Sequence, residues 1–185
     1  MAVDPRRKQK AKVLRQVRRI HRYSGLALFV FFVVVGITSV LLGWKKNVEW
    51  IMPPTQRAAT AVELADWLPQ AELATRAQVA LREALGTATD DRVDRLDGRP
   101  GKGVVKVLFK TGNYEVQLDA GTGEVLSLGK RRADLIEQIH DGSIVDEWVG
   151  TSGAPIKVFY STVLGLALVV FSATGFWLWY GPRRM

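Results

Sequence analysis

The chain has 185 residues, enough for about one domain, with 26 Lys or Arg against 18 Asp or Glu and a net charge of +8. It contains no cysteine, which excludes disulfide bonds, thiolate metal sites and iron–sulfur clusters. Nine of the basic residues lie in residues 1–22, whereas residues 23–182 hold 15 basic and 17 acidic residues. Because no basic patch remains in the only region large enough to fold, we expect no nucleic-acid partner.

Two long runs without any charged residue, residues 24–44 and 158–180, dominate the hydropathy pattern. Each is longer than the roughly 20 residues that a helix needs to cross about 30 Å of hydrocarbon. We therefore predict two transmembrane helices. We expect the first to be retained, because its basic and apolar parts are too long for a signal peptide and Gly43-Trp44-Lys45-Lys46 offers no small-residue cleavage site.

The basic residues also predict the orientation, because Lys and Arg close to a membrane helix stay in the cytoplasm. They lie before the first run and after the second, so both termini are expected in the cytoplasm and the middle of the chain outside it. The chain then divides into a basic juxtamembrane helix (1–23), a first membrane helix (24–44), an exported domain with its connector (45–157), a second membrane helix (158–180) and a cytoplasmic tail (181–185).

Helical periodicity predicts the elements of the N-terminal half. Val13, Val17 and Ile20 recur at helical spacing with no Gly or Pro, so one helix is expected from about Lys10 to Trp44. A capping box of Thr60 and Glu63 predicts a short helix ending before Pro69. An amphipathic helix follows and stops at Gly86; its apolar positions are Leu73, Ala77, Ala80, Leu81, Ala84 and Leu85.

The pattern then changes to alternation of period two, which is typical of half-buried strands. Three strands carry it: one through Val105, Val107 and Phe109, one through Tyr114, Val116 and Leu118, and one from Glu124 to Leu128, with an earlier and weaker strand at Val93 and Leu96. The expected module is a helix on one face of an antiparallel sheet, with Leu81, Leu85, Val107, Phe109, Val116 and Leu118 in its core. A last helix from about Arg132 to His140 leads to a Gly- and Ser-containing connector with Pro155.

Only two residues are obvious candidates for cofactor chemistry, the histidines His21 and His140. The predicted topology places them on opposite sides of the bilayer, separated by about 30 Å of hydrocarbon, so they do not ligate one metal within one chain. The residues alone leave two interpretations open. In the first, the histidines of two chains together bind a metal or haem. In the second, neither histidine binds a cofactor: His21 lies among the lipid headgroups, and His140 is placed favourably by the dipole at the C-terminal end of its helix. Asp134, Glu137 and Asp141 near His140 fit a solvated helix face better than a metal site.

The membrane runs contain no Asp, Glu, Lys, Arg or His, which disfavours a proton or ion pathway. They are rich in small residues, and helix packing is the simplest explanation for them. These small residues include Gly25, Gly36, Thr38, Ser161, Gly165, Thr174 and Gly175.

Several short motifs resemble the PepSY-associated transmembrane proteins. Those of the membrane helices are Ile20-His21-Arg22-Tyr23-Ser24-Gly25-Leu26, Gly36-Ile37-Thr38, Ile139-His140-Asp141-Gly142 and Ala173-Thr174-Gly175-Phe176-Trp177-Leu178-Trp179. In between, Val104 to Phe109, Asn113-Tyr114-Glu115-Val116 and Thr122-Gly123-Glu124-Val125 resemble a PepSY domain. The resemblance implies a membrane α protein with a small α+β domain, in which two transmembrane helices flank a PepSY-like module.

The resemblance further implies a bacterial inner-membrane protein with a periplasmic or extracellular domain. Larger relatives include ferric-siderophore reductases in which histidine-bound haem b passes electrons across the membrane. By this resemblance His21 and His140 are haem-iron ligands. With only two membrane helices and two histidines, the chain would complete such a site only as a homodimer or as a subunit of a larger complex. The alternative function is a non-enzymatic anchor whose PepSY-like domain binds a partner protein, and no enzymatic activity follows from the sequence.

Overall fold

The structure, a computed structural model, describes residues 5–58 and 63–181. The chain forms two compact units: one holds Val40–Glu137, and the other joins the residues up to Ser39 with those from Gln138 onward. Two helices continue from one unit into the other, α1 (Pro5–Gly43) and α3 (Arg132–Asp141).

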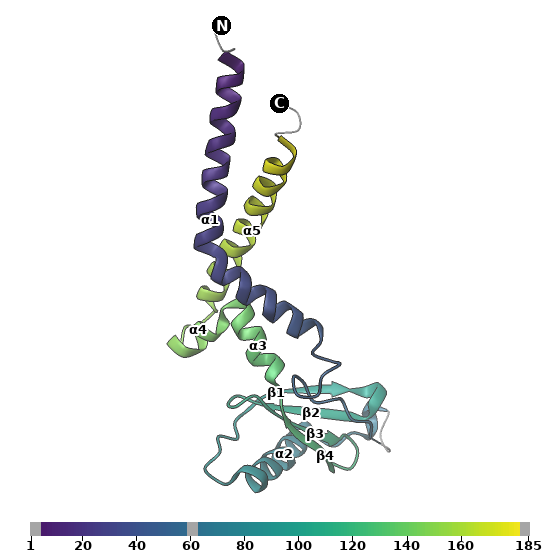
Figure 1. Ribbon diagram of the computed structural model, residues 1–185. Coiled ribbons are helices and arrows are strands. Elements are labelled where there is room, and N and C mark those ends of the chain that lie inside the picture. The colour runs from purple at the N-terminus through teal and green to yellow at the C-terminus, as the bar shows by residue number, and fades with distance from the viewer. Residues whose placement is uncertain (1–4, 59–62, 182–185) are drawn as a thin grey trace. The chain divides into compact units, whose positions relative to one another are not determined.

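The membrane unit is built on α1 and α5 (Pro155–Tyr180), which are the two helices long and apolar enough to span a membrane in the part of the chain described (Figure 1). They run antiparallel side by side. The ring centroids of Phe31 and Tyr160 are 6.1 Å apart, and those of Phe32 and Phe171 are 5.6 Å apart. Gly25 permits this approach, because an added Cβ would lie 2.7 Å from the Phe171 ring.

Most large apolar side chains of these two helices are exposed in the isolated chain, as expected of helices that lipid surrounds. The prediction of two membrane helices and of one continuous first helix is therefore confirmed. The structure starts that helix at Pro5, earlier than the predicted Lys10.

The second unit contains one antiparallel sheet with the strand order β1-β2-β3-β4. Its strands are β1 (Val93–Arg99), β2 (Val104–Phe109), β3 (Tyr114–Asp119) and β4 (Val125–Lys130). Helix α2 (Gln70–Leu85) packs on one face of this sheet. The core between them holds Leu73, Ala77, Leu81, Val105, Val107, Phe109, Val116, Leu118 and Ala120. The predicted helix-on-sheet module is present, and the strand predicted at Val93 and Leu96 is confirmed as β1.

The prediction of Leu85 as a core residue is wrong, because its side chain is 41% exposed. Residues four positions apart on a helix are offset by about 40°, since one turn takes 3.6 residues. Leu73, Ala77 and Leu81 stay on the buried face of α2, whereas Leu85 has rotated about 120° from Leu73 and leaves it.

The other face of the sheet is buried as well, although its side chains are polar. Lys106, Glu115 and Gln117 are at most 1% exposed. The Glu115 carboxylate accepts hydrogen bonds from Lys106 Nζ at 3.1 Å and Arg131 Nη1 at 2.7 Å. The Gln117 side chain donates to Glu115 at 2.7 Å and to the Pro54 carbonyl at 3.0 Å. The segment around Pro54 covers this face, and mutual pairing makes the buried charges tolerable.

Two local predictions need correction. The short helix expected before Pro69 is a single 3₁₀ turn, η1 (Leu64–Asp66), and Thr60 of its capping box lies outside the described residues. The expected connector after His140 contains a helix, α4 (Ser143–Val149). Gly142 makes the turn into it at φ +80°, and an added Cβ there would lie 2.8 Å from the Tyr160 ring. A seven-residue helix is too short to show a periodic pattern.

Candidate functional site

His21 lies on α1 and faces α5. Its Nδ1 is 2.9 Å from the hydroxyl oxygen of Thr174, and its ring stacks on Phe171 with centroids 4.1 Å apart and planes inclined by 17°. The α5 backbone is close to the ring at Gly175, where an added Cβ would be 3.4 Å from His21 Cε1. The imidazole is thus held from two sides by one helix.

His140, near the end of α3, is held by the same kind of contact. Its Nδ1 is 2.8 Å from the hydroxyl oxygen of Thr38 on α1. Thr38 is 7% exposed and lies six residues, or about 9 Å of helix, inside the end of the uncharged run at Trp44. The ring therefore lies beside the uncharged run of α1.

The threonine hydroxyls determine which imidazole nitrogen carries the proton. Thr38 Oγ1 donates its single proton to a carbonyl of its own helix, at 2.7 Å from Val34 and 3.1 Å from Val35. Thr174 Oγ1 does the same, at 2.8 Å from Val170 and 3.0 Å from Phe171. Each hydroxyl must then accept from the imidazole. With this assignment of donors Nδ1 carries a proton, and in the neutral ring Nε2 carries the lone pair.

This arrangement is what a metal-ligating histidine requires. The ligating nitrogen has a free lone pair, and the other nitrogen donates to a partner that fixes the tautomer and the ring orientation. Within the residues that the structure describes, no hydrogen bond occupies Nε2 of His21 or of His140. By the chemistry of its donor atoms, each histidine therefore fits an axial ligand of haem iron.

A cavity of about 180 Å³ opens beside His140 between α1, α3 and α5. Its wall is mostly apolar and comprises Phe32, Val35, His140, Asp141, Tyr160, Ser161, Leu164, Gly165 and Leu168. At Gly165 an added Cβ would have no neighbour within 4 Å. Pockets for small molecules typically enclose about 300–1,000 Å³, so this cavity is smaller than a typical ligand pocket.

Two carboxylates hold the end of α3 and the start of α5 in place beside this cavity. Asp141 pairs with Lys157 of α5 at 2.6 Å. Burial raises the pKa of the Asp141 carboxyl, but hydrogen bonds from Lys157 and Ser143 outweigh this effect and leave the pKa below its ordinary value. Asp146 of α4 accepts the backbone N–H groups of Ile156 and Lys157 at 3.1 and 2.6 Å. Asp146 therefore caps the N-terminus of α5, because the N-cap residue of α5 is Ala154, which has no side chain that accepts a hydrogen bond.

The structure does not bring the two histidines together. Thr38, the partner of His140, is 17 residues after His21 on the same helix, which corresponds to about 26 Å. His21 lies near the C-terminal end of α5, at Thr174, and His140 near its N-terminal end, beside Tyr160. The expectation that one chain does not supply two ligands to one metal agrees with this geometry.

No group of three or more His, Cys, Asp or Glu side chains is placed to hold a metal ion among the described residues. The acidic residues near His140 are engaged otherwise: Asp134 pairs with Arg131 at 2.9 Å, and Asp141 with Lys157.

Sequence reasoning missed the roles of Thr38 and Thr174, which it assigned to helix packing. A usable signal was present, because both threonines lie within motifs that resemble the family and each is one of few hydroxyls in an apolar helix. What the sequence could not show is which histidine meets which threonine, since the partners are 102 and 153 residues apart.

Comparison with known proteins gives one family match. The sequence profile described as the PepSY-associated TM region matches residues 18–185. The matched part includes both histidines, both threonines and both apolar helices. No curated protein matches the chain.

Proposed function

Since the chain belongs to the family of PepSY-associated transmembrane regions, and is therefore a membrane protein, we propose that it binds haem b and carries electrons across the bilayer. The proposed ligands are Nε2 of His21 and Nε2 of His140. The larger relatives named by the sequence resemblance suggest that the electrons serve the reduction of ferric iron or ferric siderophores. Bound haem supplies reversible one-electron transfer at its iron.

The observation that carries the proposal is the matched pair of histidine–threonine contacts at 2.9 and 2.8 Å. A histidine placed only for packing does not need its tautomer set by a hydroxyl that has already donated its own proton. Here the same contact occurs twice, near opposite ends of the α1–α5 pair, and each time it engages Nδ1 and leaves Nε2 for the proposed ligation.

The proposed assembly is a homodimer with a two-fold axis along the membrane normal. One chain offers one histidine at each level, about 26 Å apart along α1, and a small cavity beside His140. A second copy would contribute the second imidazole at each level and would convert two apolar helices into a four-helix bundle, an architecture that can enclose a macrocycle.

The proposed location is a bacterial inner membrane, with the sheet-containing unit in the periplasm and both termini in the cytoplasm. The nine basic residues before the first apolar run support this orientation. The sheet-containing unit, with its α2-covered face, is proposed to be a PepSY-like domain. No catalytic residue is assigned to it.

The test is a visible spectrum of the purified full chain from haem-replete cells, oxidised and reduced, with haem and protein both quantified. We expect a reduced low-spin b-type spectrum in the wild type and one haem per chain, because each dimer holds two. His21→Gln and His140→Gln keep a polar side chain but remove the imidazole, and each should halve the haem content. Phe29→Ala, which changes an exposed side chain of α1, is the matched control and should retain all of it.

Three outcomes contradict the proposal or one of its parts. A colourless wild-type preparation would overturn haem binding and make the partner-binding membrane anchor the better function. A coloured protein whose spectrum survives both substitutions would overturn the ligand assignment. A monomeric mass for the haem-loaded protein would overturn the two-fold assembly.

A further inference from the structure

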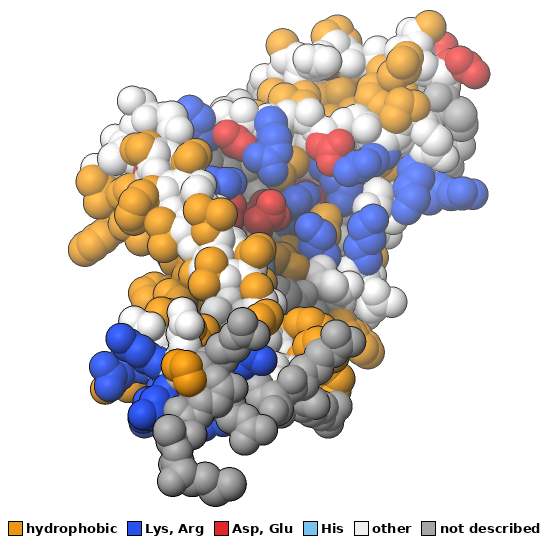
Figure 2. Space-filling view, turned by 90° about the horizontal axis from the view of Figure 1, so that it is seen from above, with side chains coloured by type: hydrophobic (Ala, Val, Ile, Leu, Met, Phe, Trp, Pro, Cys, Tyr) orange, Lys and Arg blue, Asp and Glu red, His pale blue; other side chains and the backbone are white. Residues whose placement is uncertain are grey.

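The N-terminal part of α1 carries four arginines on one side of the helix. Arg15, Arg18, Arg19 and Arg22 follow the spacing i, i+3, i+4, i+7, which at about 100° per residue gathers them within an arc of about 100°. All four are exposed, and with Tyr23 they line an open cavity of about 400 Å³. We call these four residues the arginine stripe. Figure 2 shows Lys and Arg side chains gathered at this end of the membrane unit.

The arginine stripe has no counter-charge in the described part of the protein. None of its four guanidinium groups forms an ion pair or a hydrogen bond with another described side chain. Like charges three and four residues apart on a helix repel one another. The stripe therefore favours an anion that contacts several of its members at once.

The centre of the stripe lies outside the face of α1 that contacts α5. On this part of α1 the half-buried residues are Leu14, Val17 and His21, and His21 contacts α5 directly. The centre of the stripe is rotated about 110° from His21 around the helix axis. The site needs no contact with His21, so the inference does not depend on the haem proposal.

The depth of the stripe matches a layer of lipid headgroups. Counted from Ser24, where the uncharged run begins, Arg22 is about 3 Å and Arg15 about 13 Å further out along the helix. A bilayer of about 40–45 Å with a hydrocarbon core of about 30 Å has headgroup regions about 5–8 Å thick on each side. Arg18, Arg19 and Arg22 fall in or at the edge of this region, and Arg15 lies just beyond it.

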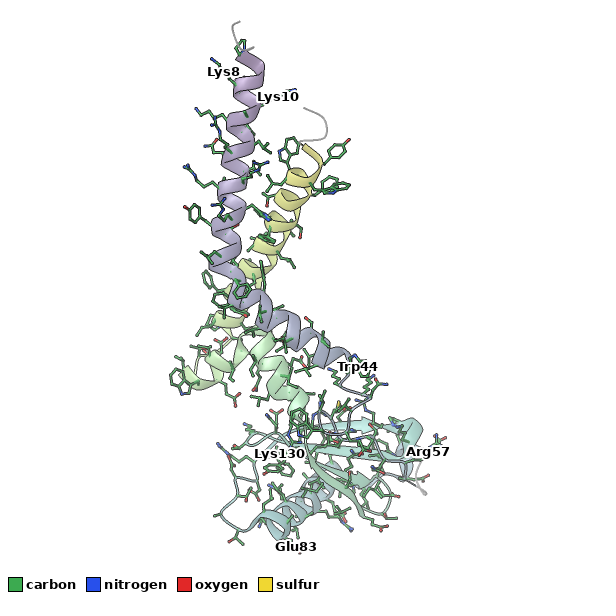
Figure 3. All side chains as sticks on the ribbon, viewed as in Figure 1. Lys8, Lys10, Trp44, Arg57, Glu83 and Lys130 are labelled. Carbon is green, nitrogen blue, oxygen red and sulfur yellow. The ribbon has the colours of Figure 1, made fainter. Side chains whose placement is uncertain are left out.

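The choice of residue types separates this site from a plain orientation signal. Residues 8–12 carry three lysines, Lys8, Lys10 and Lys12, the first two of which are labelled in Figure 3, whereas the four basic residues nearest the membrane that share a face are all arginine. Orientation in the membrane needs only positive charge, and Lys serves as well as Arg. A guanidinium group, in contrast, binds two phosphate oxygens through a planar fork that Lys lacks.

We propose that the arginine stripe is a binding site for the phosphate groups of anionic phospholipids. The four guanidinium groups hold the headgroup phosphates from one side of α1, and the exposed ring of Tyr23 lies beside the acyl-chain boundary. The net negative charge of such a lipid neutralises a stripe that no described side chain pairs with.

The experiment is a titration of the detergent-solubilised full chain with phosphatidylglycerol and with phosphatidylcholine of the same acyl chains, with bound lipid counted by native mass spectrometry. The wild type should bind phosphatidylglycerol more tightly. The variant in which all four arginines become Lys keeps the charge, and therefore the membrane orientation, and should bind it about tenfold more weakly. The matched control replaces Lys8, Lys10 and Lys12 by Arg and should bind as the wild type does.

Equal affinity of the wild type for the two lipids would overturn the proposal. An unchanged affinity for phosphatidylglycerol in the Arg→Lys variant would overturn it as well, because the stripe would then act through its positive charge alone. Inorganic phosphate is a separate arm of the experiment. If it competes with the lipid at millimolar concentration, the site recognises free phosphate and the lipid assignment is wrong. The comparison of the two lipids on the wild type tests the proposal even if the Arg→Lys variant fails to insert.

Discussion

At the residue scale, the notable feature is the way that two threonines in apolar helices control two histidines. Each hydroxyl donates to a helix carbonyl and accepts from Nδ1, so that both rings present Nε2 as a lone-pair nitrogen. This is a property of the protein itself, and it can be tested in the absence of any cofactor.

We predict that Thr174→Val releases the tautomer of His21 and that Thr174→Ser preserves it, because only the hydroxyl is needed. Imidazole ¹⁵N NMR on protein from cells that make no haem distinguishes the two nitrogens, and a chain with two histidines yields few signals. Thr162→Val changes an exposed threonine of the same helix and should leave the spectrum unaltered. A protonated Nδ1 that persists in Thr174→Val would show that the hydroxyl does not set the tautomer.

A second residue-scale prediction concerns Asp146. Burial raises the pKa of its carboxyl, but hydrogen bonds from Thr151 and from the backbone of Lys157 and Ile156 outweigh burial and lower it. A carboxyl with a lowered folded-state pKa stabilises the protein above its unfolded-state pKa of about 3.9, and this contribution is lost as the pH falls through the folded-state value. The thermal midpoint of Asp146→Ala should therefore lie below that of the wild type at neutral pH.

The lowered pKa of Asp146 also predicts how the difference in thermal midpoint depends on pH. The gap between wild type and Asp146→Ala should be constant from about pH 5 to 8 and should close below about pH 4. Glu147→Ala removes a neighbouring exposed carboxylate and serves as the control. A gap of the same size at acid pH would mean that the carboxylate charge does not contribute to the cap on α5.

At the scale of elements, the contact between α2 and the sheet decides which side of the helix is buried. Leu73, Ala77 and Leu81 stay fully buried against the strands, whereas Leu85 turns away. On the other face of the sheet, β2 and β3 bury a charged network around Glu115. A sheet covered on both faces is better insulated from solvent than the single-sided module that alternation predicts.

Phe109 and Leu85 provide the matched test of this packing. Phe109→Ala removes a ring that is 4% exposed and should cost about 3–5 kcal/mol in the free energy of unfolding of the sheet-containing unit. Leu85→Ala removes a side chain that is 41% exposed and should cost well under about 2 kcal/mol. Chemical denaturation followed by tryptophan fluorescence, with Trp67 packed against this core, measures both. Equal losses would show that the end of α2 is more deeply buried than described.

At the scale of the whole molecule, the antiparallel contact of α1 and α5 determines where the two ends of the membrane unit lie. His21 meets Thr174 and Phe31 meets Tyr160, so α1 begins and α5 ends at the same end of the pair. The basic residues at that end support the proposal that it faces the cytoplasm.

We predict that alkaline phosphatase fused near residue 90 is active and that the same enzyme fused at the C-terminus is inactive, because it folds only outside the cytoplasm. A green fluorescent protein fused at the two positions should show the opposite pattern. An active phosphatase at the C-terminus, with none near residue 90, would reverse the proposed orientation.

Much of the architecture could be predicted from the sequence. The two membrane helices follow from runs of 21 and 23 uncharged residues, and the strands from alternation that begins at Val105 and Tyr114. The family was recognisable from short motifs that the profile match bears out. The two histidines were the obvious candidates for cofactor chemistry, because the chain has no cysteine and no other histidine.

Only the tertiary structure showed what surrounds those histidines, and that the buried face of α2 ends before Leu85. The pairing of His140 with Thr38, the burial of Glu115 on a sheet face that reads as polar, and the cap that Asp146 places on α5 join residues that the chain separates. Periodicity reports how one element divides its own faces between apolar and polar surroundings. It contains no information about which distant element supplies the partner, because a hydroxyl, carboxylate or imidazole shows the same local pattern whether water or another side chain satisfies it.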